Sequence, residues 1–273
     1  MQASINLQLP TIHPVHCMRP LFRSASLVST LLSLALIVLA RCADSEVRKG
    51  EAIPKARPAD GANVPDAVLQ GREILGKVRM SQALQQLSRL KGSLRNDETG
   101  KDIPFDLTMA DGLVRFVFKD PNEILNLNIE TAKLTRIIAG SKAEVPRSLG
   151  NERVRDTHIN YEDLSMRFLY WPNATLTGTD SVRSRKCWVV RATIPQGDYG
   201  PYGTVDVWVD QGSGAMMMMR AYDFQGKKVK EFKVISGQKY KEAWILREMR
   251  VESYDSIKGD LKGRTYMEIK DPG

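Results

Sequence analysis

His158 is the first residue to consider for chemistry, because it is the only histidine after residue 16. It lies near three carboxylates, those of Asp156, Glu162 and Asp163. A zinc site would need further histidines, and a calcium site would need a tighter set of carboxylates. We therefore predict no metal-binding or catalytic role for this group, and expect a surface histidine ahead of a helix that Asn160 caps.

Two further carboxylates, Asp206 and Asp210, share one face of a predicted strand with Trp208. Paired carboxylates can perform acid–base catalysis, but on an exposed sheet face we expect ordinary solvated charges. The sequence has no Gly-x-Ser-x-Gly nucleophile motif, no phosphate-binding loop and no His-Glu-x-x-His zinc motif. We therefore predict that the protein is not an enzyme and needs no cofactor.

The segment 227–233 is rich in lysine, but charged and apolar residues alternate in it. Lys228, Lys230 and Glu231 flank Phe232 and Val234. This alternation predicts a single strand with one solvated, charged face.

Four consecutive methionines, Met216 to Met219, are unusual. On a regular strand, Met217 and Met219 share one face, and Met216 and Met218 share the other. Methionine adapts its shape and is common on surfaces that bind varied apolar ligands. An apolar sheet face that contains it lines a cavity or forms a filled core, and periodicity alone does not distinguish the two.

The elements that would position these residues are mostly strands. A period of two, typical of strands, runs through residues 113–118, 124–129, 187–192, 204–210, 216–222, 228–235, 243–254 and 264–269. Because short turns join roughly ten strands, we predict a mainly β (α+β) fold with one antiparallel sheet that curls or closes. Helical spacing predicts an N-terminal helix over 66–80 and a short internal helix over 161–170.

The N-terminal region has the pattern of a cleavable export signal. Arg19 and Arg23 precede an apolar run over 27–40 that is too short to span a bilayer. We predict a signal peptide over residues 1–40, with Met18 as a candidate true start and cleavage after Ala40. The alternative is a membrane anchor that stays uncut. We predict that residues 41–64 form a flexible linker and that residues 65–273 form the folded domain.

Cys42 leaves two fates open for the exported protein. Residues 39–42 resemble the lipobox of bacterial lipoproteins, whose cysteine is acylated, although Arg41 stands where a small residue is usual. The alternative is a free cysteine in a loose tail. Only Cys42 and Cys187 follow Ala40, so the chain is not a disulfide scaffold.

The net charge of the chain is modestly basic. It is +8, and removal of the two arginines in the signal leaves +8 − 2 = +6. An excess of this size in an exported protein does not indicate nucleic-acid binding. A solvated surface explains it, and attraction to an anionic membrane is the alternative.

The second half of the chain carries a set of stretches that identify a family resemblance. They are YEDL at 161–164, RFLYWP at 167–172, RKCW at 185–188, GPYGTVDVWVD at 200–210, AYD at 221–223, GK at 226–227, Trp244, and EMR at 248–250. Together with the order of elements, these stretches resemble a branch of the LolA-like outer-membrane lipoprotein-sorting proteins. The resemblance covers about residues 66–270.

The resemblance implies an incomplete β-barrel closed by helices around an apolar cavity for acyl chains. Shielding such a chain from water is worth about 0.8 kcal/mol per CH₂. The helices over 66–80 and 161–170 would form the lid. In the family an arginine on the sheet helps to hold the lid closed, and Arg115 is the candidate here.

Our leading hypothesis is therefore a periplasmic carrier, soluble or membrane-tethered, that binds a lipid or a lipoprotein acyl chain without catalysis. The alternative is a sensor or interaction module that uses the same fold to bind an inner- or outer-membrane protein. The predicted cavity wall consists of apolar side chains from the alternating strands: Val114, Phe116, Phe118, Leu125, Leu127, Trp188, Val190, Val205, Val207, Met217, Met219 and Phe232.

Overall fold

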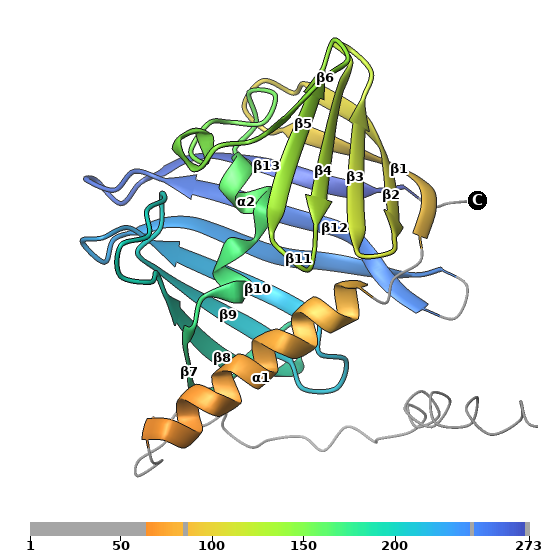
Figure 1. Ribbon diagram of the computed structural model, residues 1–273. Coiled ribbons are helices and arrows are strands. Elements are labelled where there is room, and N and C mark those ends of the chain that lie inside the picture. The colour runs from red at the N-terminus through yellow and green to blue at the C-terminus, as the bar shows by residue number, and fades with distance from the viewer. Residues whose placement is uncertain (1–63, 84–86, 241–242, 271–273) are drawn as a thin grey trace, which may run out of the picture. The chain divides into compact units, whose positions relative to one another are not determined.

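The computed structural model describes residues 64–83, 87–240 and 243–270. The predicted signal peptide, Cys42 and the predicted linker up to residue 63 lie outside these residues. The described part consists of one antiparallel sheet with a few helices (Figure 1).

The sheet has thirteen strands, in the order β6-β5-β4-β3-β2-β1-β13-β12-β11-β10-β9-β8-β7. Their bounds are β1 Leu87–Asn96, β2 Asp102–Ala110, β3 Leu113–Phe118, β4 Glu123–Asn128, β5 Lys133–Ile138, β6 Ser141–Glu144, β7 Asn173–Val182, β8 Arg185–Thr193, β9 Thr204–Asp210, β10 Met216–Tyr222, β11 Lys228–Tyr240, β12 Ala243–Tyr254 and β13 Leu261–Ile269. The predicted antiparallel sheet is confirmed. It curves but does not close, because its edge strands β6 and β7 are not paired with each other.

The chain builds this sheet as two meanders. The first runs from β1 outward to the edge strand β6, and the second runs from the opposite edge, β7, inward to β13, which pairs with β1. The chain must therefore pass from one edge to the other between β6 and β7. Residues 145–172 make this passage, and Figure 1 shows them, in green, crossing in front of the sheet. We call them the crossover.

The crossover contains the predicted internal helix, which is confirmed only in part. It holds the 3-10 turn η1 Arg147–Leu149, the helix α2 Tyr161–Ser165 and the 3-10 turn η2 Arg167–Tyr170. Met166 has a φ of 48°, a left-handed conformation that ends α2. The prediction of one helix over 161–170 is therefore wrong at this residue, whereas the predicted Asn160 cap is confirmed.

The N-terminal helix is confirmed and slightly longer than predicted, as α1 Val64–Ala83. Its buried side chains Ile74, Leu75 and Val78 belong to the main apolar core. The helix lies close to β7, because a Cβ atom at Gly71 would be 2.7 Å from the carbonyl oxygen of Ala174. The guanidinium of Arg72 also donates to the carbonyl of Pro172 at 2.6 Å, which ties α1 to the end of the crossover.

The prediction of roughly ten strands is too low because several strands lack a clear apolar period. Strand β1, for example, includes Gly92, over which the ring of Phe105 packs so closely that a Cβ atom would be 2.4 Å from it. Strand β6 is exposed along its whole length. In such strands backbone pairing with neighbours determines the structure, and the side chains carry little signal.

Candidate functional site

The inner face of the sheet carries one continuous apolar cluster. Ten of the twelve predicted wall residues are buried members of it, each no more than 8% exposed: Val114, Phe116, Phe118, Leu125, Leu127, Val190, Val205, Val207, Met219 and Phe232. Trp188 is partly buried and packs against the same cluster. These side chains, which period-two alternation predicts to share one face, do lie on one face of the sheet. That face is closed to solvent.

Met217 is the exception, and its predicted face is wrong. The register between β9 and β10 shifts between Met216 and Met218, so that Met218 lies opposite Trp208 and Met219 opposite Val207. This bulge adds one residue and reverses the alternation before Met218. Met216 and Met219 therefore contact the main core, whereas Met217 and Met218 pack in a second cluster with Val182, Cys187, Val189 and Trp208.

The crossover covers the inner face with apolar side chains of its own. Val154, Ile159, Leu164, Phe168 and Leu169 are buried in the same core as the sheet residues. Several polar side chains of the crossover, among them Asn160, Glu162 and Asp163, are also buried and therefore need partners. The partners come from both meanders, and three sets of contacts fasten the crossover to them.

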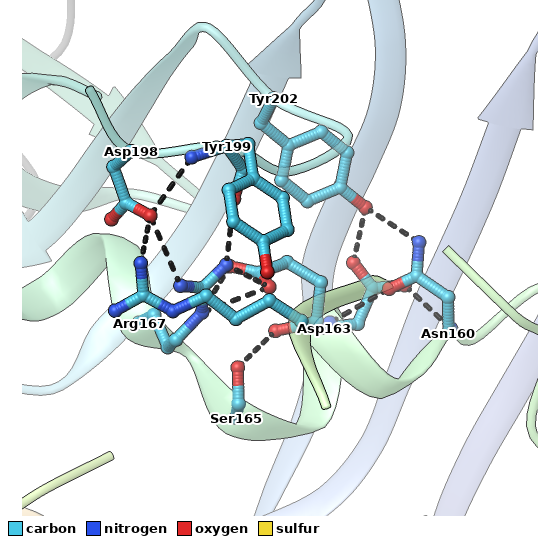
Figure 2. A network of polar contacts seen from close by, with 9 residues as sticks. Asn160, Asp163, Ser165, Arg167, Asp198, Tyr199 and Tyr202 are labelled. Carbon is cyan, nitrogen blue, oxygen red and sulfur yellow. Dashed lines mark hydrogen bonds and ion pairs between the residues drawn. The ribbon is translucent and has the colours of Figure 1, made fainter. Parts of the chain in front are cut away.

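The first set joins α2 to the loop between β8 and β9 (Figure 2). Asn160 and Asp163 form a capping box, in which each side chain accepts from the backbone N–H of the other, at 2.7 and 2.9 Å. The Tyr202 hydroxyl donates to the Asp163 carboxylate at 2.5 Å and accepts from the Asn160 amide at 3.2 Å. Burial, together with the Asp163 charge, holds the pKa of Tyr202 well above its usual range.

Lys230, on β11, extends this set of contacts to the sheet itself. Its ammonium lies 3.0 Å from the Asp163 carboxylate and donates to the carbonyl of His158 at 2.7 Å. Lys230 and Glu231 are both buried, so the predicted solvated face of this strand is wrong. The signal was present in the sequence, because Lys230 shares the inward face with Phe232, two residues on.

The second set joins the end of α2 to the same loop. The Arg167 guanidinium donates to both oxygens of Glu162, to Oε2 at 2.6 Å and to Oε1 at 3.1 Å, and to the carbonyl of Tyr199 at 3.3 Å. Its other terminal nitrogen lies 3.7 Å from Asp198. Burial raises the pKa of Glu162, and the hydrogen bond from Arg167 opposes this rise.

The third set joins α2 to the first meander. The Tyr161 hydroxyl donates to Glu123 on β4 at 3.2 Å. Glu123 also accepts from Arg136 at 2.6 Å and from Arg155 at 2.7 Å. Burial, with the Glu123 charge, raises the pKa of Tyr161 to about 12. The helix α2 is therefore held by Glu123 on one half of the sheet and by Lys230 and Tyr202 on the other.

His158 is buried, at 2% exposed, so the prediction of a surface histidine is wrong. Its Nε2 lies 3.3 Å from a Glu98 oxygen, and its backbone N–H donates to the Thr265 hydroxyl at 2.8 Å. Burial lowers the pKa of His158, and the positive charges of the nearby Arg153 and Lys230 lower it further. The hydrogen bond with Glu98 opposes this decrease. The neighbouring carboxylates Glu162 and Asp163 are engaged with Arg167 and Lys230 instead.

Asp206 and Asp210 are also buried rather than solvated. Arg191 donates to both oxygens of Asp206 at 2.7 Å, and Arg185 to those of Asp210 at 3.0 and 2.9 Å. These pairs lie on the face of β8 and β9 opposite the apolar core. Each of these two carboxylates is therefore engaged in a two-point ion pair with an arginine.

Arg115 lies on β3 between the inward-facing Val114 and Phe116 and is itself exposed. It therefore faces away from the crossover, and the suggestion that it fastens the lid is wrong. Lys230 is a sheet cation that does contact the crossover from the inner face.

Within the described residues, no group of three or more His, Cys, Asp or Glu side chains is arranged to hold a metal ion. No helix in the same part of the chain is long and apolar enough to cross a membrane. Cys187 is buried and unbridged, and burial raises the pKa of its thiol to about 11.

Comparison with known proteins identifies the architecture. A domain named for outer membrane lipoprotein sorting, from Vibrio parahaemolyticus, matches with a TM-score of 0.57 and 12% identity over 75% of this chain and 92% of that one. A DUF1329 family protein from Desulfovibrio piger matches with a TM-score of 0.51 and 16% identity, over 75% and 92%. A LolA superfamily protein from Nitrosomonas europaea matches with a TM-score of 0.51 and 13% identity, over 74% and 94%.

These similarities show that the described chain has the LolA-like fold, as the sequence resemblance implied. A family model described as "-like: Uncharacterized protein" matches residues 140–272. No curated protein matches the sequence.

Proposed function

We propose that this protein is an exported, non-catalytic carrier that holds an acyl chain between the inner face of its sheet and the crossover. The observation that carries this proposal is the combination of a continuous apolar inner face with a separate covering segment. That segment is fastened through a small number of polar side chains, with Lys230 and Asp163 at their centre. A lid of this kind can open without unfolding the sheet beneath it.

The LolA-like fold and the apolar face support lipid as the ligand. Apolar side chains from both meanders, such as Phe116 on β3 and Val207 on β9, meet in one cluster. An acyl chain placed there gains about 0.8 kcal/mol for each CH₂ removed from water. In the closed structure the side chains of the crossover occupy this surface, so we propose that lipid displaces Leu164 and Phe168.

The compartment follows from the same proposal. The predicted signal peptide and the names of the similar proteins support a periplasmic location, where a lipid must cross water between two membranes. Cleavage after Ala40 would give a soluble shuttle, and acylation of Cys42 a tethered acceptor. The N-terminal mass of the exported protein distinguishes these two forms.

Native mass spectrometry of the exported protein, followed by uptake of a fluorescent fatty acid, tests the carrier function. We expect co-purifying lipid and saturable uptake. Phe116→Asp should abolish uptake, whereas Val117→Asp, on the opposite face of the same strand, should not. A folded protein that holds no lipid and binds no fatty acid would refute the carrier, and would favour the interaction module.

A further inference from the structure

His158 lies at the point where the crossover contacts both meanders. Its backbone N–H donates to the Thr265 hydroxyl on β13 at 2.8 Å. Its carbonyl accepts from the Lys230 ammonium on β11 at 2.7 Å and from the Ser253 hydroxyl on β12 at 3.4 Å. Its Nε2 lies 3.3 Å from a carboxylate oxygen of Glu98, in the turn between β1 and β2. This one residue therefore joins the crossover to four neighbouring parts of the sheet.

The contact between the ring and Glu98 depends on a glycine in β13. A Cβ atom at Gly263 would overlap both a Glu98 carboxylate oxygen and Nε2 of His158, so any other residue there would push the two side chains apart. The His158 side chain is 1% exposed, whereas the Glu98 side chain is 47% exposed. The ring is therefore buried behind a carboxylate that is in contact with water.

The surroundings of the imidazole ring satisfy one N–H group but not two. In the neutral ring one nitrogen carries a hydrogen and the other is an acceptor. A hydrogen on Nε2 faces the Glu98 carboxylate, and Nδ1 is then a buried acceptor that has no partner within the described residues. Protonation places a hydrogen on Nδ1 as well. An unsatisfied donor in a charged ring costs more than an unsatisfied acceptor in a neutral one, so the closed structure disfavours the protonated ring.

The charges around the ring also oppose its protonation. Lys230 contacts the carbonyl of the same residue from β11, and Arg153 is a nearby cation of the crossover itself. Glu98 is the carboxylate that favours the protonated ring, but water screens its half-exposed charge. The contacting groups from β12 and β13 are uncharged hydroxyls. Burial, with the two cations, holds the pKa of His158 below its ordinary value of 6.5, against the contribution of Glu98.

We propose that protonation of His158 loosens the crossover, so that acidification opens the apolar inner face of the sheet. A charged ring gains free energy by moving into water. It reaches water only if the backbone of His158 leaves Thr265 and Lys230, and the crossover moves with it. The opening itself does not require a ligand. Its effect on lipid rests on the carrier function proposed above, because an open crossover lets a bound acyl chain exchange faster.

The direction of the response identifies the group that titrates. His158 is the only histidine after residue 16, and histidine is the side chain whose ordinary pKa lies near neutral pH. Glu162, in α2, is another buried acid of the crossover. Burial raises its pKa, and the hydrogen bond from Arg167 opposes this rise. The closed structure therefore binds the Glu162 proton more readily than an open one does, so acid acts on Glu162 to close the crossover.

Hydrogen exchange of the exported chain measures the opening without any ligand. Exchange is compared at about pH 7.5 and about pH 5.5, after correction for the intrinsic effect of pH on exchange. The reporters are the amides of Val154, Leu164 and Met166, which are hydrogen-bonded within the crossover. They should open more readily than amides of β9 and β11 at both pH values. Their opening constant should rise by up to about tenfold at the lower pH, the limit for one group whose pKa is 6.5 when the crossover is open.

Two substitutions test whether His158 is the group that responds. His158→Gln should remove the rise in opening at the lower pH. Glu98→Gln is the matched control and should keep the rise, because the carboxylate opposes the acid effect. The proposal is overturned if the rise persists in His158→Gln or disappears in Glu98→Gln. It is also overturned, with no variant needed, if the crossover of the unaltered chain opens only together with the sheet or opens equally at both pH values.

Release of a fluorescent lysophosphatidylcholine tests the connection to lipid. This probe has no group that titrates near neutral pH, so a change in its release rate reports on the protein. Release should be up to about tenfold faster at the lower pH from the unaltered chain, and equally fast at both pH values from His158→Gln. Acid-induced opening of a protein that does not bind the probe would refute the carrier and uphold the opening. Binding of the probe with release that does not depend on pH would uphold the carrier and overturn the opening.

Discussion

The ammonium of Lys230 on β11 lies 3.0 Å from the carboxylate of Asp163 on α2, and both groups are buried. This ion pair joins the second meander to the crossover that covers it. Through Asp163 it also reaches Tyr202, and through the carbonyl of His158 it holds the chain that leads into α2. The stability of the crossover should therefore depend on the side chains of Lys230, Asp163 and Tyr202.

Replacement of Lys230 by methionine should lower the free energy of unfolding by about 3–5 kcal/mol, because it leaves the buried Asp163 charge without its partner. Chemical denaturation measures this change. Lys233→Met is the control, since Lys233 is half-buried on the opposite face of the same strand, and it should change stability little. Equal effects of the two substitutions would show that the ion pair has no special role.

Removal of the Tyr202 hydroxyl should also loosen the crossover. Tyr202→Phe takes away the donor to Asp163 and leaves the Asn160 amide without its acceptor, which should cost about 1–3 kcal/mol. Hydrogen exchange at the amides of α2 should then accelerate more than exchange in the sheet. The comparison is Tyr199→Phe, at an exposed ring nearby, which should leave both measurements unchanged.

His158 should make stability depend on pH. Its pKa in the folded protein lies below the ordinary value of 6.5, so the folded state disfavours the proton that the unfolded chain accepts. Stability should therefore be fully present above about pH 6.5 and fall as the pH drops below that value. His158→Gln should flatten this part of the profile in denaturation measurements. An NMR titration that places the His158 pKa at or above 6.5 would contradict the expectation.

Two glycines in α1 should respond to alanine in opposite directions. A Cβ at Gly71 would be 2.7 Å from the carbonyl oxygen of Ala174, so Gly71→Ala must push the helix away from β7 and destabilise the protein. At Gly76 the nearest atom is the end of the flexible Arg79 side chain, at 3.6 Å. Gly76→Ala should therefore stabilise by about 0.5–1 kcal/mol through helix propensity. Thermal unfolding of the two variants provides the comparison, and a change of the same sign in both would refute this account of how α1 packs.

Local sequence patterns were sufficient to predict much of the fold. Alternation in β3, β4 and β9 identified the strands and the inward side chains, among them Phe116, Leu125 and Val207. The same reasoning failed at Met217, because a bulge in one strand shifts the register against its neighbour. A bulge depends on pairing between strands, and the order of residues within one strand does not reveal it.

The sequence by itself determined the antiparallel sheet, the N-terminal helix, most of the apolar inner face and the cap at Asn160, because these depend on periods and spacings along the chain. Only the tertiary structure decided that His158 is buried and that Asp206 pairs with Arg191. It also decided that residues 145–172 pass from edge to edge across the sheet. The physical reason is that the burial of a polar side chain depends on the partner that compensates for lost water, and these partners lie far away in the sequence.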